Sequence, residues 1–313
     1  MSAAAELVDL QVNGYGGVDF NDDGVTVQQI AAACRHMLRD GVDAALATII
    51  TDDLPAMQRR LARLVAAREA DADVARVLVG WHVEGPFISP VAGYVGAHPA
   101  EAVRPATIDA ASRLLDAGAG LVRLVTLAPE QDAGGAVTRH LTDAGAAVAA
   151  GHSNASLDEL RTAIDNGLSL YTHLGNGCPA VMPRHDNIVQ RVLSLADRLW
   201  IMFIADGVHV PWFALGNYLR AAGLDRSIVV SDAIAAAGLG PGEYSLRGER
   251  VTVDEQLATW SSDRSHLRGA ATSLRQARDN LVQHLGLSAR EAQQLCSDNP
   301  RRVLANLGGR RTL

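Results

Sequence analysis

The sequence contains no lysine, and all 28 basic residues of the 313-residue chain are arginine. Lysine forms Schiff bases with carbonyl substrates, binds phosphate in Walker-type loops and, once carbamylated, bridges pairs of metal ions. The absence of lysine therefore excludes these three kinds of catalytic or binding site.

Aromatic residues and cysteines are also few: aromatics make up 4% of the chain, and the cysteines are Cys34, Cys178 and Cys296. Few aromatics, with abundant alanine, valine, leucine and glycine, favour helices packed on a parallel sheet over an aromatic-rich β-sandwich. The cysteines lie far apart and form no Cys-x-x-Cys motif, which is typical of reduced thiols in a cytoplasmic protein.

The sequence has no apolar run long enough to span a membrane, and residues 1–9 do not combine a basic region with an apolar stretch. We therefore expect a cytoplasmic protein that is neither exported nor membrane-bound. The net charge of −7 argues against binding to nucleic acid or to anionic membrane surfaces. Hydrophobic residues make up 48% of the chain, enough for a large core.

Short apolar runs alternate with longer amphipathic stretches along most of the chain. The runs predict eight strands, at Glu6–Val12, Ala44–Ile50, Val77–Val83, Leu121–Leu127, Ala147–Ala150, Leu168–Thr172, Trp200–Ala205 and Ile228–Ser231. The stretches between them predict helices such as Val27–Asp40, Leu54–Ala70, Thr107–Ala117, Leu157–Asn166 and Pro211–Ala222. Such alternation is typical of right-handed βαβ units, and eight parallel strands favour a TIM-type (β/α)8 barrel over an open sheet.

The remaining segments complete the predicted domain. Ser156 and Glu159 form a capping-box pattern that predicts where the helix after the fifth strand begins. The segment Gly238–Arg250, rich in glycine and charge, is predicted to be a long loop. Further helices are predicted near Ser273–Leu285, Ala289–Asp298 and Pro300–Leu307. Without a repeat or a linker, we expect residues 1–313 to form one barrel domain with C-terminal helices.

Polar residues stand where the predicted strands end, and in a parallel barrel these ends form the active-site rim. They are Glu84 after the third strand, His152 after the fifth, His173 after the sixth, Asp206 and His209 after the seventh and Asp232 after the eighth. A carboxylate and two imidazoles that converge form a three-ligand metal site with an open position, and a nearby aspartate can take a proton from water. A lone histidine or aspartate at a strand end is more often a packed residue or a helix cap, but the whole group favours a functional site.

Two further positions bear on the number of metal ions. His82 has the same strand parity as Glu84 but lies one layer deeper, so we interpret it as a core residue or as support for a ligand. Many metal-dependent hydrolases on this barrel hold a second metal with His-x-His at the end of the first strand, where this chain has Gln11 and Asn13. Both are poor zinc ligands, so we predict a single metal ion.

Short motifs follow one another along residues 9–233 of the chain. They are Asp9–Gly14 with Gly17–Asp22, His82–Pro86, Gly96–Pro99, Leu127–Glu130, Gly151–Ala155, Thr172–Asn176, Ala205–Val210 and Ser231–Ala233. In sequence and order they resemble the N-acetylglucosamine-6-phosphate deacetylase family of the amidohydrolase superfamily, and the resemblance runs from about residue 9 to about residue 306.

This resemblance implies a deacetylase that hydrolyses the acetamide of an N-acetylated amino sugar, with N-acetylglucosamine 6-phosphate as the expected substrate. Glu84, His152 and His173 would bind one divalent ion. Zinc is the first expectation, although two imidazoles and a carboxylate also suit iron, cobalt or manganese. Asp232 would be the general base that activates the water and then the acid that protonates the departing amine.

The resemblance also implies which residues bind the substrate. The sugar site would include Ala97, His98, Asn176, Gly177 and His209, of which His209 would also polarise the acetamide carbonyl. Arg184 has the same offset from His173 as the family's phosphate-binding arginine, which reaches into the neighbouring subunit's site. The implied partners are therefore a small amino-sugar substrate and a second copy of the chain in a homodimer.

The chain also departs from the family pattern. Relatives have a small β-domain made from both chain ends, which we expect to be missing here, with residues 238–264 or oligomerisation covering the exposed barrel surface. His185-Asp186-Asn187 follows Arg184 in place of a Pro-Gly pair, and Leu267–Ala271 replaces a Gly-Ser-rich loop.

These departures keep two alternatives open. One is the same chemistry on a nonphosphorylated or modified N-acyl amino sugar or another cyclic amide. It is distinguished by whether Arg184 and the loop of Arg268 bind phosphate. The other is a catalytically silent paralogue that binds a sugar phosphate. It is disfavoured because the predicted ligands and Asp232 are all present.

Overall fold

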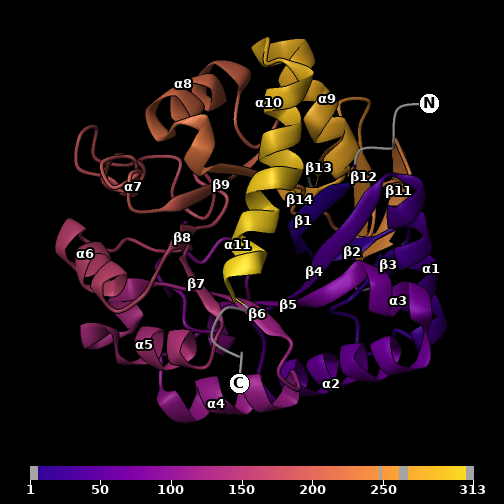
Figure 1. Cartoon of the computed structure of the whole chain (residues 1–313), viewed down its shortest axis with the longest axis horizontal. Coiled ribbons are helices and arrows are strands. Elements are labelled where there is room, and N and C mark those ends of the chain that lie inside the picture. The colour runs from indigo at the N-terminus through magenta and orange to yellow at the C-terminus, as the bar shows by residue number, and fades with distance from the viewer. Residues whose placement is uncertain (1–5, 247–248, 261–266, 308–313) are drawn as a thin grey trace.

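The computed structural model describes residues 6–246, 249–260 and 267–307 of the chain. Within them, eight parallel strands form one sheet in the order β1-β4-β5-β6-β7-β8-β9-β10, surrounded by helices (Figure 1). The strands are β1 (Leu7–Val12), β4 (Val42–Ile50), β5 (Leu78–Glu84), β6 (Val122–Leu127), β7 (Ala147–Ala150), β8 (Leu170–Tyr171), β9 (Trp200–Ile204) and β10 (Ser227–Val230). Each strand begins and ends within two residues of its predicted bounds, which confirms the predicted barrel.

The first and last strands, β1 and β10, are joined mainly by residues at and just after their C-terminal ends. Val12 forms a parallel bridge with Ala233, and the amide of Asn13 donates to the carbonyl of Ala233 at 2.8 Å. The buried Asp9 carboxylate adds a link, because its Oδ1 accepts from the amide of Ser231 at 3.2 Å. The first and last strands are thereby held together, and the sheet is nearly closed into a barrel.

The helices lie outside the sheet and at one end of the barrel. They are α1 (Val27–Arg39), α2 (Leu54–Ala70), α3 (Ala72–Val77), α4 (Ile108–Ala117), α5 (Ala136–Asp143), α6 (Leu157–Asp165), α7 (Ile188–Leu193), α8 (Trp212–Ala222), α9 (Leu274–Leu285), α10 (Ala289–Gln293) and α11 (Asn299–Leu307), with a π-helical turn at Gln294–Asp298. Short 3₁₀ turns lie at Ala100–Ala102, Pro129–Gln131, Ala133–Gly135 and Leu224–Arg226.

The predicted capping box of α6 is confirmed. Ser156 Oγ accepts from the amide of Glu159 at 3.2 Å, and Glu159 Oε2 accepts from the amide of Ser156 at 2.7 Å. The predicted start of the third strand is wrong by one residue. Val77 ends α3, whose first turn is fixed because Asp71 Oδ1 accepts from the amide of Val74 at 3.1 Å.

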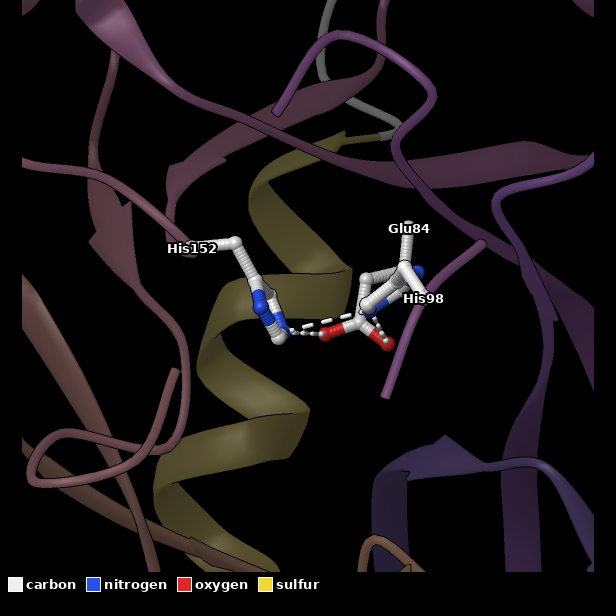
Figure 2. Close-up of side chains that lie close together, drawn as sticks. All are labelled: Glu84, His98 and His152. Atoms are coloured by element: carbon white, nitrogen blue, oxygen red, sulfur yellow. Dashed lines mark hydrogen bonds and ion pairs between the residues drawn. The ribbon is translucent and has the colours of Figure 1, made fainter. Parts of the chain in front are cut away.

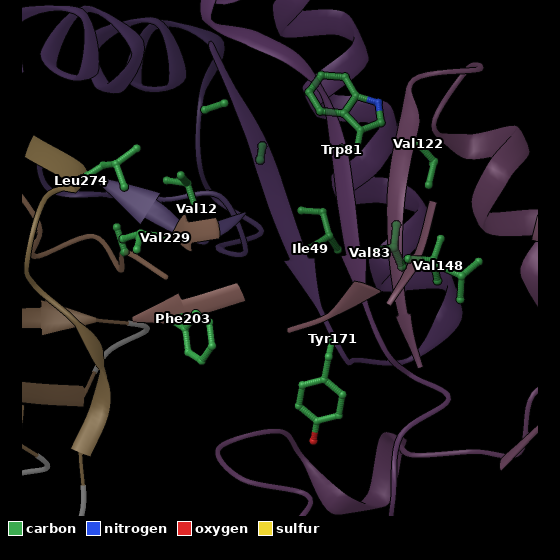
Figure 3. Packing of buried hydrophobic residues seen from close by; sticks show 14 of the residues in the cluster. Val12, Ile49, Trp81, Val83, Val122, Val148, Tyr171, Phe203, Val229 and Leu274 are labelled. Carbon is green, nitrogen blue, oxygen red and sulfur yellow. The ribbon is translucent and has the colours of Figure 1, made fainter. Parts of the chain in front are cut away.

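Apolar side chains form two buried layers. The outer layer lies between the strands and the surrounding helices and includes Trp81, Val83 and Tyr171 (Figure 3). The inner layer fills the barrel interior with small and branched side chains such as Leu46, and Val303 of α11 packs onto it. Helix α11, yellow in Figure 1, crosses in front of the strands and covers this end of the barrel. The opposite end, where the strands terminate, is left for polar side chains.

Two small antiparallel sheets accompany the barrel. One pairs β2 (Gly14–Tyr15) with β3 (Val18–Asp19), and the other is a four-stranded sheet between β10 and α9. The strands of the larger sheet are β11 (Gly242–Leu246), β12 (Glu249–Val253), β13 (Ala258–Trp260) and β14 (Leu267–Ala270).

The prediction that Gly238–Arg250 is a loop is therefore wrong. Strand β12 alternates polar residues with the buried Val251 and Val253, and β11 pairs with β12 across this stretch. Residues 261–266, which fall between β13 and β14, lie outside the described residues. No helix of the described chain has the length and apolar character needed to cross a lipid bilayer.

Candidate active site

The polar residues predicted for the rim come from the ends of four barrel strands. Glu84 is the last residue of β5, His152 is the second residue beyond β7, and His173 and Asp232 are the second residues beyond β8 and β10. Glu84, His152 and His173 are buried, and Asp232 is half-buried. Since parallel strands all end on the same side of a barrel, the topology itself brings these residues together.

His152, His173 and Asp232 share an unusual backbone conformation. Their φ angles are +50°, +30° and +49°, in the left-handed region that residues other than glycine adopt uncommonly, although asparagine, aspartate and histidine are found there more often than most. Strained backbone of this kind persists where the surrounding contacts over-determine it, and it is concentrated at functional sites.

The donor atoms of Glu84, His152 and His173 converge. Glu84 Oε1 lies 2.9 Å from His173 Nε2 and 3.4 Å from His152 Nε2, and the two Nε2 atoms are 3.2 Å apart. In a tetrahedral site with metal–ligand bonds of about 2.0–2.1 Å, neighbouring ligand atoms are about 3.3 Å apart. The chemistry and the spacing of these donors therefore fit a small divalent metal ion.

His98 brings a further imidazole into the same cluster. Its Nε2 lies 3.3 Å from Nε2 of His152 and 3.9 Å from Oε2 of Glu84 (Figure 2). Glu84, His98 and His152 are all buried and could themselves hold a metal ion. The family resemblance implied a substrate-binding role for His98, which lies in the loop after β5.

Neighbouring groups orient these donors. The ring of His152 contacts the backbone carbonyl of Tyr94 through Nδ1 at 2.9 Å, which leaves the Nε2 lone pair available for a metal. Gln11 Nε2 donates to Glu84 Oε1 at 3.0 Å, and Gln11 Oε1 accepts from Thr172 Oγ1 at 2.6 Å. Gln11 thus supports the Glu84 carboxylate from the end of β1, where the sequence predicted no metal ligand.

Glycines make room for the His152 ring. A Cβ atom at Gly96 would lie 3.0 Å from its Cε1, and one at Gly177 would lie 3.0 Å from its Nδ1. Both glycines also have positive φ, at +60° and +59°. The Gly-Ala-His-Pro motif and the Asn176-Gly177 pair are therefore packed directly against a predicted ligand.

Glu84 and His173 shift each other's pKa in opposite directions. Burial alone would raise the pKa of Glu84, but hydrogen bonds from His152 and His173 outweigh it and hold this pKa well below the usual range. Burial lowers the pKa of His173, but the Glu84 carboxylate outweighs burial and the net shift is upward. Glu84 and His173 both favour their charged forms, so a metal ion that binds these atoms competes with a proton.

Asp232 and His209 each have a fixed partner. Asn13 Nδ2 donates to Asp232 Oδ1 at 2.7 Å, and burial together with the charge of Glu84 raises the pKa of Asp232. Asp206 Oδ2 lies 2.5 Å from His209 Nδ1, and Oδ1 of Asp206 accepts from the amide of His209 at 2.9 Å. Burial lowers the pKa of His209, but hydrogen bonding to Asp206 more than compensates and raises it overall.

The other predicted substrate-binding residues lie in rim loops. Ala97 is exposed beside His98, and Asn176 is half-buried with its Nδ2 donating to the carbonyl of His173 at 3.1 Å. Arg184 is exposed, and within the described chain it makes no hydrogen bond or ion pair. The side chain of Arg268, also considered for phosphate binding, lies outside what the structure describes.

His82 is a structural residue beneath the site. Its Nε2 lies 2.8 Å from Thr126 Oγ1 and its Nδ1 lies 3.4 Å from Thr48 Oγ1, and burial lowers its pKa to about 4. The supporting roles of Gln11 and Asn13 were not predicted. The two residues alternate at the end of β1, so both side chains point toward the rim, and this spacing is the sequence feature that could have predicted their hydrogen bonds to Glu84 and Asp232.

Converging imidazoles and a carboxylate at the C-terminal rim of a (β/α)8 barrel, with an aspartate at the end of the last strand, define a hydrolase of the amidohydrolase class. No protein-family model matches the chain. It is 32% identical over 297 residues to N-acetylgalactosamine-6-phosphate deacetylase of Escherichia coli O157:H7, covering 95% of this chain and 76% of that protein. It is 34% identical over 312 residues to N-acetylglucosamine-6-phosphate deacetylase of Bos taurus, covering 96% and 74%.

Solved structures agree with these relatives. The N-acetyl-D-glucosamine-6-phosphate deacetylase of Mycobacterium smegmatis matches 96% of this chain and 78% of its own, with a TM-score of 0.84 and 28% identity. The enzyme of Pasteurella multocida matches 96% of this chain and 76% of its own, with a TM-score of 0.83 and 28% identity. The chain belongs to the N-acetylglucosamine-6-phosphate deacetylase family.

Proposed function

We propose that this protein hydrolyses the acetamide of N-acetylglucosamine 6-phosphate to glucosamine 6-phosphate and acetate. The observation that supports this most directly is the convergence of Glu84, His152 and His173 within 2.9–3.4 Å of one another at the rim. Relatives named for this reaction match nearly the whole chain, and a structure of the Mycobacterium smegmatis enzyme is a complex with N-acetyl-D-glucosamine-6-phosphate.

Glu84, His152 and His173 are the proposed metal ligands, and zinc is the proposed ion. When bound there, a divalent ion supplies Lewis-acid polarisation and lowers the pKa of water to about 7. Gln11 and the Tyr94 carbonyl support two of the ligands from behind. No second metal is proposed, because Gln11 and Asn13 each hydrogen-bond a carboxylate.

Asp232 is the proposed proton carrier. Burial and the nearby charge of Glu84 make its carboxylate more basic than a solvated aspartate, which suits it to accept a proton from the attacking water. The same proton can then go to the nitrogen of the departing amine. Asn13 holds Oδ1, so one carboxylate oxygen stays in a fixed place throughout.

His209 is proposed to donate a hydrogen bond to the acetamide oxygen. Asp206 fixes its ring through Nδ1 and favours the protonated imidazole, so Nε2 can serve as a donor to an oxygen that gains negative charge. Ala97, His98, Asn176 and Gly177 are proposed to line the sugar site, and exposed Arg184 to bind the 6-phosphate of a substrate in a homodimer. A cytoplasmic location is also proposed, since all three cysteines are unpaired thiols.

The relative from Escherichia coli O157:H7 supports a second candidate substrate, N-acetylgalactosamine 6-phosphate. A nonphosphorylated sugar is a further candidate, because His185-Asp186-Asn187 departs from the family pattern directly after Arg184, the proposed phosphate ligand. The test is acetate release by zinc-loaded protein from N-acetylglucosamine 6-phosphate, N-acetylgalactosamine 6-phosphate and N-acetylglucosamine, with metal content measured in parallel. A preference for either phosphorylated sugar supports the proposal and selects the epimer.

Comparable activity on N-acetylglucosamine would instead favour a nonphosphorylated substrate. If metal-loaded protein released no acetate from any of the three sugars, the proposed function would be wrong. The catalytically silent paralogue would then be the better interpretation.

A further inference from the structure

The segment Ser153–Ala155, directly after His152, is held from two sides. On one side Glu130, from the loop after β6, accepts from Ser153 Oγ at 2.6 Å and from the amide of Asn154 at 2.7 Å. On the other side Arg191 of α7 donates through Nη1 to the carbonyl of Ala155 at 3.0 Å and to the carbonyl of Asn154 at 3.4 Å. Glu130 thus binds the donors of this segment and Arg191 binds its acceptors.

Arg191 also binds the next rim loop. Its Nε donates to Asp186 Oδ1 at 2.6 Å, and its Nη2 donates to the carbonyl of Asp186 at 3.4 Å. Asp186 lies two residues after Arg184, and the neighbouring Asn187 caps α7 by accepting from the amide of Gln190 at 3.1 Å. The Arg191 side chain is only 16% exposed, so its guanidinium lies between the two loops.

We propose that Arg191 is a positioning residue that couples the loop of the metal ligand His152 to the loop that contains Arg184. The proposal rests on the proposed function for the roles of His152 and Arg184. An arginine is suited to this place because its planar fork offers donors on two edges at once, which the single ammonium of lysine does not. This coupling also accounts for Asp186 in the segment His185-Asp186-Asn187, where the chain departs from the family pattern, because Asp186 supplies the carboxylate that Arg191 binds.

The two edges of Arg191 predict separable effects. Arg191→Met keeps much of the side-chain volume but removes every donor, so we expect metal affinity about 10–100-fold weaker in a competition with a chelator. We expect the KM for a 6-phosphorylated sugar to rise as well. Asp186→Ala removes the carboxylate that Arg191 holds on the edge toward the Arg184 loop and leaves the contacts with Asn154 and Ala155 in place. We therefore expect a higher KM for the phosphorylated sugar with unchanged kcat and unchanged metal affinity.

Arg198→Met is the matched control. Arg198 also binds an aspartate, with Nη2 at 2.7 Å from Asp165 Oδ1, but it is 42% exposed and outside the rim. We expect this variant to keep wild-type metal affinity and wild-type KM. Arg191→Lys should not restore both the metal affinity and the KM that are changed in Arg191→Met, because one ammonium cannot reach both loops at once.

Wild-type metal affinity in folded Arg191→Met would overturn the coupling to His152. An unchanged KM in Asp186→Ala would overturn the coupling to Arg184. Asp186 is 80% exposed at its side chain, so this variant should fold even where Arg191→Met does not. Metal affinity needs no substrate, so a failure of the proposed substrate would be seen as absent turnover in the wild type and would leave the first comparison intact.

Discussion

Three rim residues, His152, His173 and Asp232, show how single positions are specialised for function. Each adopts a positive φ at the point where a strand ends, a conformation that costs about 1–3 kcal/mol for such residues. The cost is offset by contacts around them, among them the Tyr94 carbonyl on His152 and Asn13 on Asp232. Glycine would adopt this backbone conformation at the lowest cost, so we attribute the two histidines and the aspartate at these positions to the chemistry of their side chains.

Asp232→Asn tests the proton carrier. The amide keeps the shape of the side chain and a hydrogen-bond acceptor for Asn13, but it cannot take up a proton. We expect turnover to fall by about 10²–10⁴-fold while metal content stays that of the wild type. Acetate release and metal analysis on the same preparation measure both. Loss of the metal ion in this variant would show that Asp232 is chiefly a ligand.

Substitutions within the histidine cluster decide which imidazoles bind the metal. We expect His152→Ala and His173→Ala to lose the ion, since each removes one corner of the convergent donor set. We expect His98→Ala to keep the ion and to raise KM. His140→Ala is the control, because His140 hydrogen-bonds Ser112 on the outer helices. A metal-free His98→Ala protein would make His98 a ligand, as its contact with His152 also allows.

At the scale of elements, the seam between β1 and β10 contains a buried acid. Burial raises the pKa of Asp9 to about 7, although hydrogen bonds from Ser231 and Gln11 partly oppose the shift. Between pH 4 and 7 the folded state holds a proton that the unfolded state has lost. The free energy of unfolding therefore falls as the pH rises through this window, by about 1.4 kcal/mol for each pH unit.

Asp9→Asn should remove this dependence. The asparagine cannot ionise, and its oxygen can still accept from the amide of Ser231. We expect the free energy of unfolding at pH 8 to exceed that of the wild type by on the order of 2–4 kcal/mol. The gap should be much smaller at pH 4. Urea unfolding at the two pH values measures it, and a variant less stable than the wild type at pH 8 would contradict the expectation.

The loop between β8 and α7 contains the proposed phosphate ligand. We expect Arg184→Ala to raise KM for a 6-phosphorylated sugar by about 10–100-fold, because a charge-assisted hydrogen bond contributes about 1.5–3 kcal/mol. The KM for the unphosphorylated sugar should change little, and so should kcat. Steady-state kinetics on both sugars measure the difference. Equal changes on both substrates would remove the phosphate role of Arg184.

At the scale of the whole molecule, the barrel could be predicted because each strand is a short buried run and each helix an amphipathic one. The rim followed from strand ends alone, as for Glu84 and His173. The four-stranded sheet after β10 could not be predicted in the same way, because its alternation at Val251 and Val253 is short and is surrounded by glycine and charge. The approach of His98 to Glu84 depends on the path of a long loop, which no local pattern in the sequence encodes.

The predicted homodimer implies that each active site contains Arg184 from the neighbouring subunit. If Arg184 reaches the partner's site, each site combines Asp232 of one subunit with Arg184 of the other subunit. A mixed dimer of the Asp232→Asn and Arg184→Ala variants, purified through two different tags, would then contain one complete site and one that lacks both groups. We expect it to show about half the wild-type kcat with a wild-type KM for the phosphorylated sugar, because a closed two-fold dimer has two equivalent sites. If Arg184 acts within its own subunit, the mixed dimer keeps the high KM of Arg184→Ala, and a monomer in sedimentation equilibrium would contradict the dimer itself.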